Sequence, residues 1–347
     1  MSKLVEVKNL CVDYITFNGR VRAVSDVSFH INQGEILGLA GESGCGKSTI
    51  AYSLMRLHRP PALISEGSIE FEGRDVLAMD DDQLREFRWK ETSMVFQSAM
   101  NCLNPVKTIE YQFWDIFDAH GLVSSRDESI EKAKELLRIV DIPTERLFDY
   151  PHQFSGGMRQ RVVIAMALAL KPKLLIMDEP TTALDVVVQR EILQKVYQLK
   201  EQFGFSILFI THDLSLMVEL CDRIGIMYSG KLVELAPAKQ ILSQPLHPYA
   251  HGLGDSFPTL HGELQEMKGI PGTPLDLQNV PPGCRFAPRC FKATAACREQ
   301  EPQLQQANEQ RWVACVDPLK IASQTQQPEP LTQSHSEPSE TTCVEAL

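Results

Sequence analysis

Apolar and polar positions alternate along residues 4–14, which predicts a half-buried β-strand. A second strand is expected to reach Ile31, ahead of a turn at residues 32–34. Residues 35–40 are mostly apolar and run into a glycine-rich turn, so we expect a buried strand there. A short strand at residues 68–71 is followed directly by turn residues. Four strands are therefore predicted before residue 72.

Helical spacing begins at Lys47 and is broken by the prolines at residues 60–61. From about residue 100 to 170 the pattern is again helical. Ser125 opens a capping-box sequence that Glu128 completes, which predicts a helix start. Behind it, one helix face carries apolar residues until Pro143: Ile130, Ala133, Leu137 and Val140.

Two buried strands are predicted further along, at residues 174–177 and 206–210, with a helix at about 186–203 between them. Strand, helix and strand at this spacing indicate parallel strands joined by a right-handed crossover. Composition then shifts near Pro245, and the chain becomes rich in Pro, Gly and Cys. We expect one domain at residues 1–244, a loop-rich module at 245–320 and a disordered polar tail at 321–347.

Composition narrows the class of protein. The chain has 347 residues, 43% hydrophobic, enough for a large domain and a smaller one. A net charge of −11 argues against nucleic acid as a partner, because binding to phosphate backbones needs a basic face. The longest apolar stretch, residues 162–170, is shorter than the roughly 18 residues of a membrane span. Without a signal peptide, any role at a membrane is expected to be peripheral.

Residues 41–48 fit the phosphate-binding pattern G-x-x-x-x-G-K-[ST]. The glycines let the backbone curl so that successive N–H groups point at one anion, and the helix that begins at Lys47 adds partial positive charge. We expect Lys47 to reach the β- and γ-phosphates of a nucleotide and the Ser48 hydroxyl to hold Mg²⁺. The alternative, a glycine-rich turn without a ligand, is disfavoured by the flanking strand and helix. The expected binding residues are Gly41, Ser43, Gly44, Cys45, Gly46, Lys47, Ser48 and Thr49.

Asp178 and Glu179 end a predicted buried strand, which places them at the edge where parallel sheets bind ligands. Asp178 suits a water-mediated contact with Mg²⁺. Glu179 can orient and polarise an attacking water, so it is a candidate catalytic residue. The alternative is an acidic turn ahead of Pro180.

The chain resembles the ABC ATPases from residue 1 to about 240, because further motifs follow in that family's order. Residues 154–161 (FSGGMRQR) look like the family signature, with Met158 where many members have Gln. Gln97 resembles the Q-loop glutamine, and residues 183–185 resemble the D-loop. The resemblance implies an α/β fold with a P-loop NTPase core: a parallel sheet, an antiparallel β subdomain and a helical subdomain. It also implies that ATP is the nucleotide.

The signature has a physical reading of its own. Ser155, Gly156 and Gly157 precede a helix and would form a second anion-binding helix start, with a plain N-cap turn as the alternative. Two anion-binding helix N-termini of one chain cannot easily bind the phosphates of the same ATP. The resemblance implies that two ATPase subunits pack head to tail, with ATP between the loop of one and the signature and Asp185 of the other.

The resemblance assigns roles to three more side chains. Gln97 is expected to contact Mg²⁺ and to couple closure of the helical subdomain to a membrane subunit. His212 follows a buried strand and is expected to sense the γ-phosphate, although a lone histidine is more often structural. Tyr14 is expected to stack on adenine, because Phe17 and Phe29 fit the spacing less well. Glu179, His212 and Gln97 are thus the predicted catalytic set.

Beyond residue 245 the chain resembles the C-terminal extension of ATPase subunits from oligopeptide and dipeptide permeases. The matching segments are residues 245–249 (PLHPY), 270–274 (IPGTP) and 282–290 (PGCRFAPRC). The resemblance implies import of peptides, or of nickel or short oligosaccharides, at the cytoplasmic face of the inner membrane. Expected partners are a second ATPase subunit, more often a paralogue than a copy, two transmembrane permease subunits and, indirectly, an extracytoplasmic solute-binding protein. The alternatives are a soluble ABC-type ATPase outside transport and a nucleotide sensor without hydrolysis.

Nine cysteines, five scattered and four close together, do not look like a secreted disulfide framework, so we expect a reducing cytosol. A thiol at Cys45, at a helix start, would have a lowered pKa, but a small residue tolerated in the turn is favoured. The other four lack the closely spaced pair usual for structural zinc. An iron–sulfur cluster of the [4Fe-4S] type is therefore favoured over zinc and over free or disulfide-linked thiols. Those four residues are Cys284, Cys290, Cys297 and Cys315.

Overall fold

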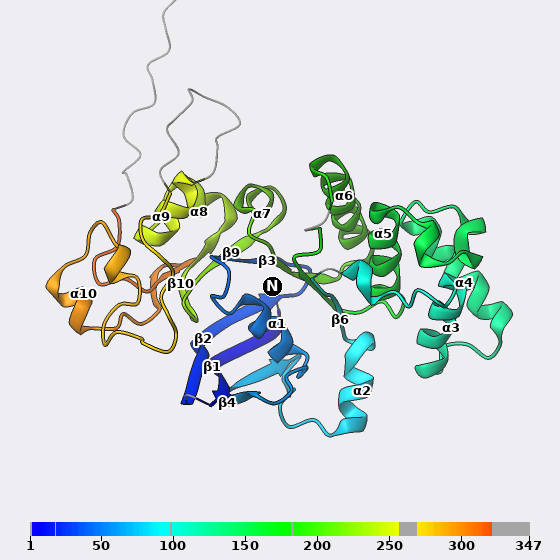
Figure 1. Cartoon of the computed structure of the whole chain (residues 1–347), viewed down its shortest axis with the longest axis horizontal. Coiled ribbons are helices and arrows are strands. Elements are labelled where there is room, and N and C mark those ends of the chain that lie inside the picture. Colours follow the sequence, from blue (N-terminus) through cyan, green and yellow to red (C-terminus); the bar gives the residue numbers. More distant parts are fainter. Residues whose placement is uncertain (1, 18, 98, 182–183, 257–268, 321–347) are drawn as a thin grey trace, which may run out of the picture.

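The computed structural model describes residues 2–17, 19–97, 99–181, 184–256 and 269–320. The predicted tail at residues 321–347 lies outside these ranges. Figure 1 shows a small antiparallel sheet beside a long sheet, with helices α3, α4 and α5 grouped at one end. The antiparallel sheet, the parallel sheet and the helical part predicted by the family resemblance are all present.

The antiparallel sheet has the strand order β2-β1-β4-β5. The first strand predicted from the sequence is confirmed, and the second extends much further towards the N-terminus than Ile31 alone indicated. Residues 18–22 are polar or glycine apart from Val21, which hides the alternation that follows. The strands are β1 (Lys3–Thr16), β2 (Gly19–Asn32), β4 (Ala62–Phe71) and β5 (Arg74–Asp75).

The long sheet has the order β11-β12-β10-β9-β3-β8-β7-β6. Strand β3 is parallel to β8 and β9, and β7 is parallel to β6 and β8, which confirms the predicted parallel sheet. Strands β10, β12 and β11 continue it in antiparallel fashion. The bounds are β3 (Ile36–Ala40), β6 (Thr92–Val95), β7 (Leu174–Asp178), β8 (Ser206–Ile210), β9 (Arg223–Tyr228), β10 (Lys231–Pro237), β11 (Gln305–Asn308) and β12 (Arg311–Val313).

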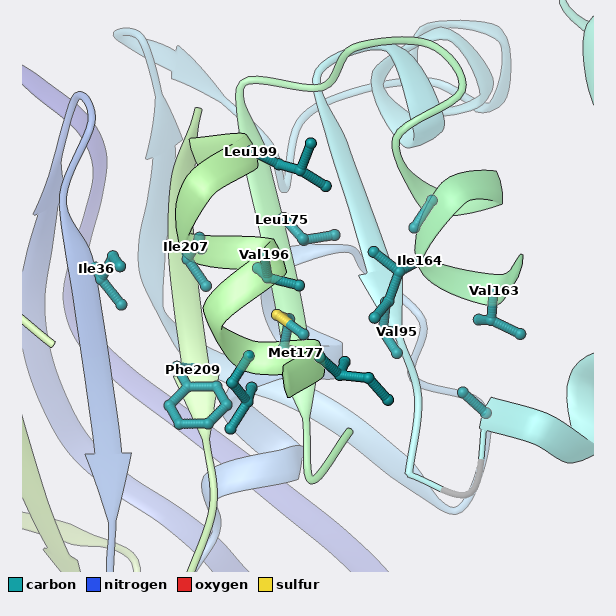
Figure 2. Packing of buried hydrophobic residues seen from close by; sticks show 14 of the residues in the cluster. Ile36, Val95, Val163, Ile164, Leu175, Met177, Val196, Leu199, Ile207 and Phe209 are labelled. Carbon is teal, nitrogen blue, oxygen red and sulfur yellow. The ribbon is translucent and has the colours of Figure 1, made fainter. Parts of the chain in front are cut away.

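Helices cover both faces of the long sheet. Figure 2 shows α6 over β7 and β8, with Val196 and Leu199 turned towards Leu175 and Ile207. On the other face, Ile50 and Leu54 of α1 belong to a core shared with both sheets. The helices are α1 (Lys47–Leu54), α2 (Asp81–Lys90), α3 (Ile109–Ala119), α4 (Arg126–Ile139), α5 (Gly156–Ala167), α6 (Val186–Phe203), α7 (Leu214–Leu220), α8 (Ala238–Ser243), α9 (Pro248–Asp255) and α10 (Ala295–Glu299). Short 3₁₀ turns are η1 (Ala99–Cys102), η2 (Thr144–Phe148), η3 (Pro151–Gln153) and η4 (Ala287–Arg289).

Two helix predictions differ in detail from the structure. Helix α1 ends at Leu54, well before the prolines expected to break it, and Arg56 then adopts a left-handed φ of 47°. At α4, the Ser125 side chain accepts from the Glu128 N–H as a cap should. The Glu128 carboxylate, however, accepts from the Ser124 N–H at 2.9 Å, so the capping box is displaced by one residue.

The C-terminal region continues the long sheet, because β12 pairs with β10. A buried ion pair fastens it there: Arg311 Nη2 lies 2.9 Å from Glu234 Oε1. Glu234 also accepts from the main-chain N–H groups of Leu246 and His247. The buried Glu234 carboxylate is thus compensated by one cation and by main-chain donors, as burial of a charge requires. Within the described ranges, none of the helices combines the length and the apolar character needed to cross a membrane.

Candidate nucleotide site

The glycine-rich loop connects β3 to α1 and needs its glycines. Gly41, Gly44 and Gly46 have φ values of 147°, 77° and 103°, a region that side chains disfavour. A Cβ on Gly41 would come within 2.1 Å of the Met227 carbonyl oxygen, and one on Gly46 within 2.8 Å of that of Ala23. The loop is therefore pressed against β9 and β2, and its backbone cannot approach them if either glycine is replaced.

Lys47 is almost fully buried within this loop. Its Nζ donates to the carbonyl oxygens of Gly41 at 2.7 Å and Glu42 at 3.1 Å. The helix that it begins has Gly46 as N-cap and no side-chain cap, so its first N–H groups are available to an anion. Ser43 and Gly44 are exposed, and Thr49 is half-buried. The loop has the form of an anion cradle, as the sequence predicts.

Ser48 and Asp178 meet at the end of β7. The Ser48 hydroxyl donates to Asp178 Oδ1 at 3.0 Å. Asp178 is 1% exposed, and burial raises the pKa of its carboxyl above the usual value. Its Oδ2 is buried, and no described residue hydrogen-bonds to it. A buried carboxylate oxygen beside a hydroxyl is a fitting partner for a hydrated Mg²⁺ ion.

Glu179 stands between two other predicted catalytic side chains. Gln97 Nε2 donates to Glu179 Oε2 at 3.1 Å, and His212 Nδ1 lies 3.8 Å from Glu179 Oε1. Glu179 has a left-handed φ of 45°, and its N–H donates to the Ile210 carbonyl oxygen at 2.8 Å. The turn thus aims the carboxylate out of the sheet edge, while His212 is 70% exposed. The structure brings Gln97, Glu179 and His212 together, from three different segments.

Tyr14 lies near the end of β1, half-buried, opposite Val21 of β2 and Ala62 of β4. Burial raises the pKa of Tyr52 in α1, and the charges of Asp178 and Tyr14 raise it further. Tyr14 thus lies near enough to Tyr52 of α1, the helix that follows the glycine-rich loop, for their charges to interact. That position suits an aromatic contact beside the loop, and its role remains a prediction.

The signature residues lie elsewhere. Ser155 is the N-cap of α5, and its hydroxyl accepts from the Met158 N–H at 3.3 Å. Asp185 is the N-cap of α6 in the same way, accepting from the Val188 N–H at 3.0 Å. A Cβ on Gly157 would meet Val188 at 2.7 Å, so the two helix starts pack closely. Figure 1 shows α5 apart from α1, so the starts of these two helices do not lie together within one chain.

Three contacts with the loop were missed by sequence reasoning. The Glu42 N–H donates to the Tyr249 hydroxyl at 2.9 Å, and both Glu42 carboxylate oxygens accept from the Arg289 guanidinium. Tyr249 and Arg289 both lie in the C-terminal segments that carried the family resemblance. Their place in those segments was the available signal, since nothing local predicts a partner more than 200 positions away.

The cysteines give a mixed outcome. Cys45 is buried, and burial raises the pKa of its thiol despite the nearby Lys47, which goes against the disfavoured alternative of a lowered pKa. All four C-terminal cysteines are free thiols. Burial raises the pKa of Cys315 to about 11, with further contributions from the charges of the other three, so the four lie in one neighbourhood. In the described part of the chain, however, no three His, Cys, Asp or Glu side chains are arranged to hold a metal ion. The described residues thus give no support to the iron–sulfur cluster, which stays a prediction from the sequence.

Comparison with known proteins gives two family matches. Residues 24–182 match the family model described as ABC transporter. Residues 233–297 match the one described as oligopeptide/dipeptide transporter, C-terminal region.

Curated relatives cover nearly the whole chain. The oligopeptide transport ATP-binding protein OppD of Bacillus subtilis is 43% identical, over 90% of this chain and 88% of its own. The dipeptide transport ATP-binding protein DppD of Caldanaerobacter subterraneus subsp. tengcongensis is 40% identical, over 91% and 97%. Among solved structures, the ATP-binding cassette MJ0796, in a dimeric post-hydrolysis state bound to ADP and phosphate, superimposes with a TM-score of 0.61. It is 28% identical, over 67% of this chain and 98% of that one.

Proposed function

The chain belongs to the ABC transporter family, in its oligopeptide and dipeptide branch, and from this premise we propose that it is the ATP-hydrolysing motor of a peptide importer. It is an ATP-binding protein with the cassette fold of ABC ATPases. The observation that carries the peptide assignment is the match of residues 233–297 to the oligopeptide/dipeptide transporter C-terminal region.

The loop, on this proposal, binds the ATP phosphates. Lys47, now held by the carbonyl oxygens of Gly41 and Glu42, is placed to donate to the β- and γ-phosphates when they enter the cradle. The uncapped N–H groups of α1 stabilise the same negative charge. Ser48 and Asp178 would hold Mg²⁺, Asp178 through water and Gln97 as a further ligand, and the ion would neutralise charge that develops on the phosphates.

Glu179 is proposed to position and polarise the attacking water. Its carboxylate is fixed on one side by Gln97 and approached on the other by His212. His212 is exposed and therefore free to reorient towards a γ-phosphate. Hydrolysis in this class depends mainly on positioning and electrostatic stabilisation, which these three side chains supply.

A facing subunit is proposed to complete the site. The start of α5, with Ser155, Gly156 and Gly157, offers N–H groups to an anion but stands apart from α1 of its own chain. A head-to-tail pair places it, together with Asp185, over the ATP of the partner; a paralogue is the favoured partner. The further proposed partners are two transmembrane permease subunits at the cytoplasmic face of the inner membrane, reached through the Gln97 segment, and a solute-binding protein outside.

Peptide uptake tests the proposal. Cells that lack this chain should fail to import labelled di- or oligopeptides, and the wild-type chain should restore uptake while Glu179→Gln should not. Unchanged peptide uptake, together with loss of uptake of another solute, would overturn the peptide assignment and leave the ATPase assignment standing.

The iron–sulfur cluster remains a prediction from the sequence, and no step of the proposed function depends on it. The four thiols share one neighbourhood but do not form a metal-holding arrangement in the described residues. Protein purified without oxygen should contain iron and acid-labile sulfide if the prediction is right. Iron-free protein with an intact fold would remove it.

A further inference from the structure

One residue of the phosphate-binding loop, Glu42, is held by two residues from the C-terminal region. The hydroxyl of Tyr249, in α9, accepts from the Glu42 N–H at 2.9 Å. Arg289, at the end of η4, donates from Nη1 to Oε2 at 2.7 Å and from Nη2 to Oε1 at 2.9 Å. Main chain and side chain of the same loop residue are thus both fixed from outside the cassette.

Arg289 is itself rigidly placed. Its side chain is 6% exposed, and its Nε donates to the Pro271 carbonyl oxygen at 2.8 Å. Nη2 also contacts the Ile270 carbonyl oxygen at 3.4 Å, and Nη1 the Tyr228 hydroxyl at 3.5 Å. Each of the three guanidinium nitrogens therefore has at least one hydrogen-bond acceptor. A two-pronged contact from such a fixed fork defines the orientation of the Glu42 carboxylate.

Tyr249 and the segment that carries Arg289 are anchored by the same aromatic cluster. The ring of Tyr249 packs against Tyr228 and Phe286, with centroids 4.7 and 5.2 Å apart, and Phe286 packs edge-on against Tyr228 at 5.1 Å. All three rings are buried. Phe286 immediately precedes η4, so the same cluster that seats Tyr249 also anchors the segment that carries Arg289.

The charge of Glu42 gives this contact a functional consequence. A carboxylate in a phosphate-binding loop repels the phosphates unless a cation compensates it. Lys47 is bonded to the Glu42 carbonyl oxygen, not to its carboxylate. Arg289 is the cation that forms an ion pair with the Glu42 carboxylate.

We propose that Arg289 is a positioning residue of the nucleotide site, which neutralises Glu42 and, with Tyr249, fixes the loop for ATP. The C-terminal region then completes the phosphate site within the same chain, in addition to any part it has in transport. This inference rests on the proposed role of residues 41–48 in phosphate binding.

A double-mutant cycle on the whole chain tests the inference, with binding of Mg²⁺–ATP measured by calorimetry. Arg289→Ala should weaken ATP binding roughly tenfold or more, because it leaves a stranded carboxylate in the loop. In a Glu42→Gln background the same change should alter binding by about twofold at most, because no charge is stranded. If Arg289→Ala does not fold, Arg289→Lys takes its place in the cycle. Arg289→Lys should bind ATP about threefold more weakly in the wild-type background and with unchanged affinity in the Glu42→Gln background.

Lys292→Ala is the matched control, since Lys292 pairs with Asp317 on the surface of the same region at 2.8 Å and should leave ATP binding unchanged. An equal loss in both Glu42 backgrounds, or no loss in either, would overturn the inference. Lys47→Ala is measured in parallel. Loss of binding there with a silent Arg289 variant refutes this inference alone, whereas retained binding refutes the assignment of the loop and this inference with it.

Discussion

Gln97 and Glu179 are joined by a hydrogen bond of 3.1 Å from the amide Nε2 to the carboxylate Oε2, across 82 positions of sequence. Gln97 follows β6 and Glu179 follows β7, and these neighbouring parallel strands end at the same edge of the sheet. A segment proposed to face the membrane subunits is thereby linked directly to the residue proposed to activate water. This bond is a route by which movement of the Gln97 segment would reach Glu179.

Replacing Glu179 by Gln should separate binding from hydrolysis. The amide keeps the size of the side chain and can still accept from Gln97, but it cannot polarise water as a carboxylate does. We expect ATP affinity within about twofold of wild type and ATP turnover reduced by about a hundredfold or more. Glu219→Gln, which removes a surface carboxylate paired with Arg190, is the control and should keep full turnover. Normal turnover in Glu179→Gln would disprove the assigned role.

Asp178→Asn should raise the stability of the nucleotide-free protein and weaken its binding of Mg²⁺. Burial raises the pKa of Asp178 above its value in the unfolded chain. At pH values above both pKa values the carboxylate is charged, and this charge lowers the free energy of unfolding. Without nucleotide at pH 7, the variant should therefore melt higher than wild type by about 1–3 °C. It should also lose the additional stabilisation that Mg²⁺ gives in the presence of ATP. Thermal melts with and without Mg²⁺ measure both; a lower melting temperature without ligand contradicts the account.

His247 should make the C-terminal region acid-sensitive. It is buried, its Nδ1 accepts from the Tyr249 N–H as a cap of α9, and burial lowers its pKa to about 3. Between about pH 6.5 and pH 3 the unfolded chain binds a proton that the folded chain refuses, so stability falls as the pH falls through that window. One such group contributes about 1.4 kcal/mol per pH unit.

His247→Asn keeps a capping side chain and removes the titration. From pH 7 to pH 5, its free energy of unfolding in urea should fall by about 2 kcal/mol less than that of wild type. Ser243→Ala, at the exposed end of the neighbouring helix α8, changes no titratable group; it is the control and should follow wild type. Parallel losses in wild type and His247→Asn would refute the prediction.

Much of the site could be predicted because its residues are contiguous in sequence and each stretch has its own chemistry. The turn at Gly41, the lysine at its end and the carboxylates behind β7 are local patterns, and the sheet brings them together as expected. The pairing of Ser48 with Asp178 follows from the order of parallel strands, since the carboxyl ends of β3 and β7 lie at one edge.

What could not be predicted is long-range. The Arg289–Glu42 ion pair joins residues 247 positions apart, and no periodicity reports such a contact. Strand β12 is three residues long, too short to show alternation of apolar and polar residues, yet it extends the long sheet. The capping box at Ser125 failed by a single residue because backbone geometry, not side-chain identity, decides which N–H group Glu128 reaches.

Calorimetric titration of Mg²⁺–ATP into the whole chain and into Lys47→Ala tests the central claim most directly. Lys47 is buried in the loop and would exchange its two carbonyl partners for phosphate oxygens. The account predicts saturable, Mg²⁺-dependent binding by wild type and affinity at least about a hundredfold weaker in the variant. A folded wild-type chain that takes up no nucleotide, or a Lys47→Ala variant that binds as tightly, would contradict it.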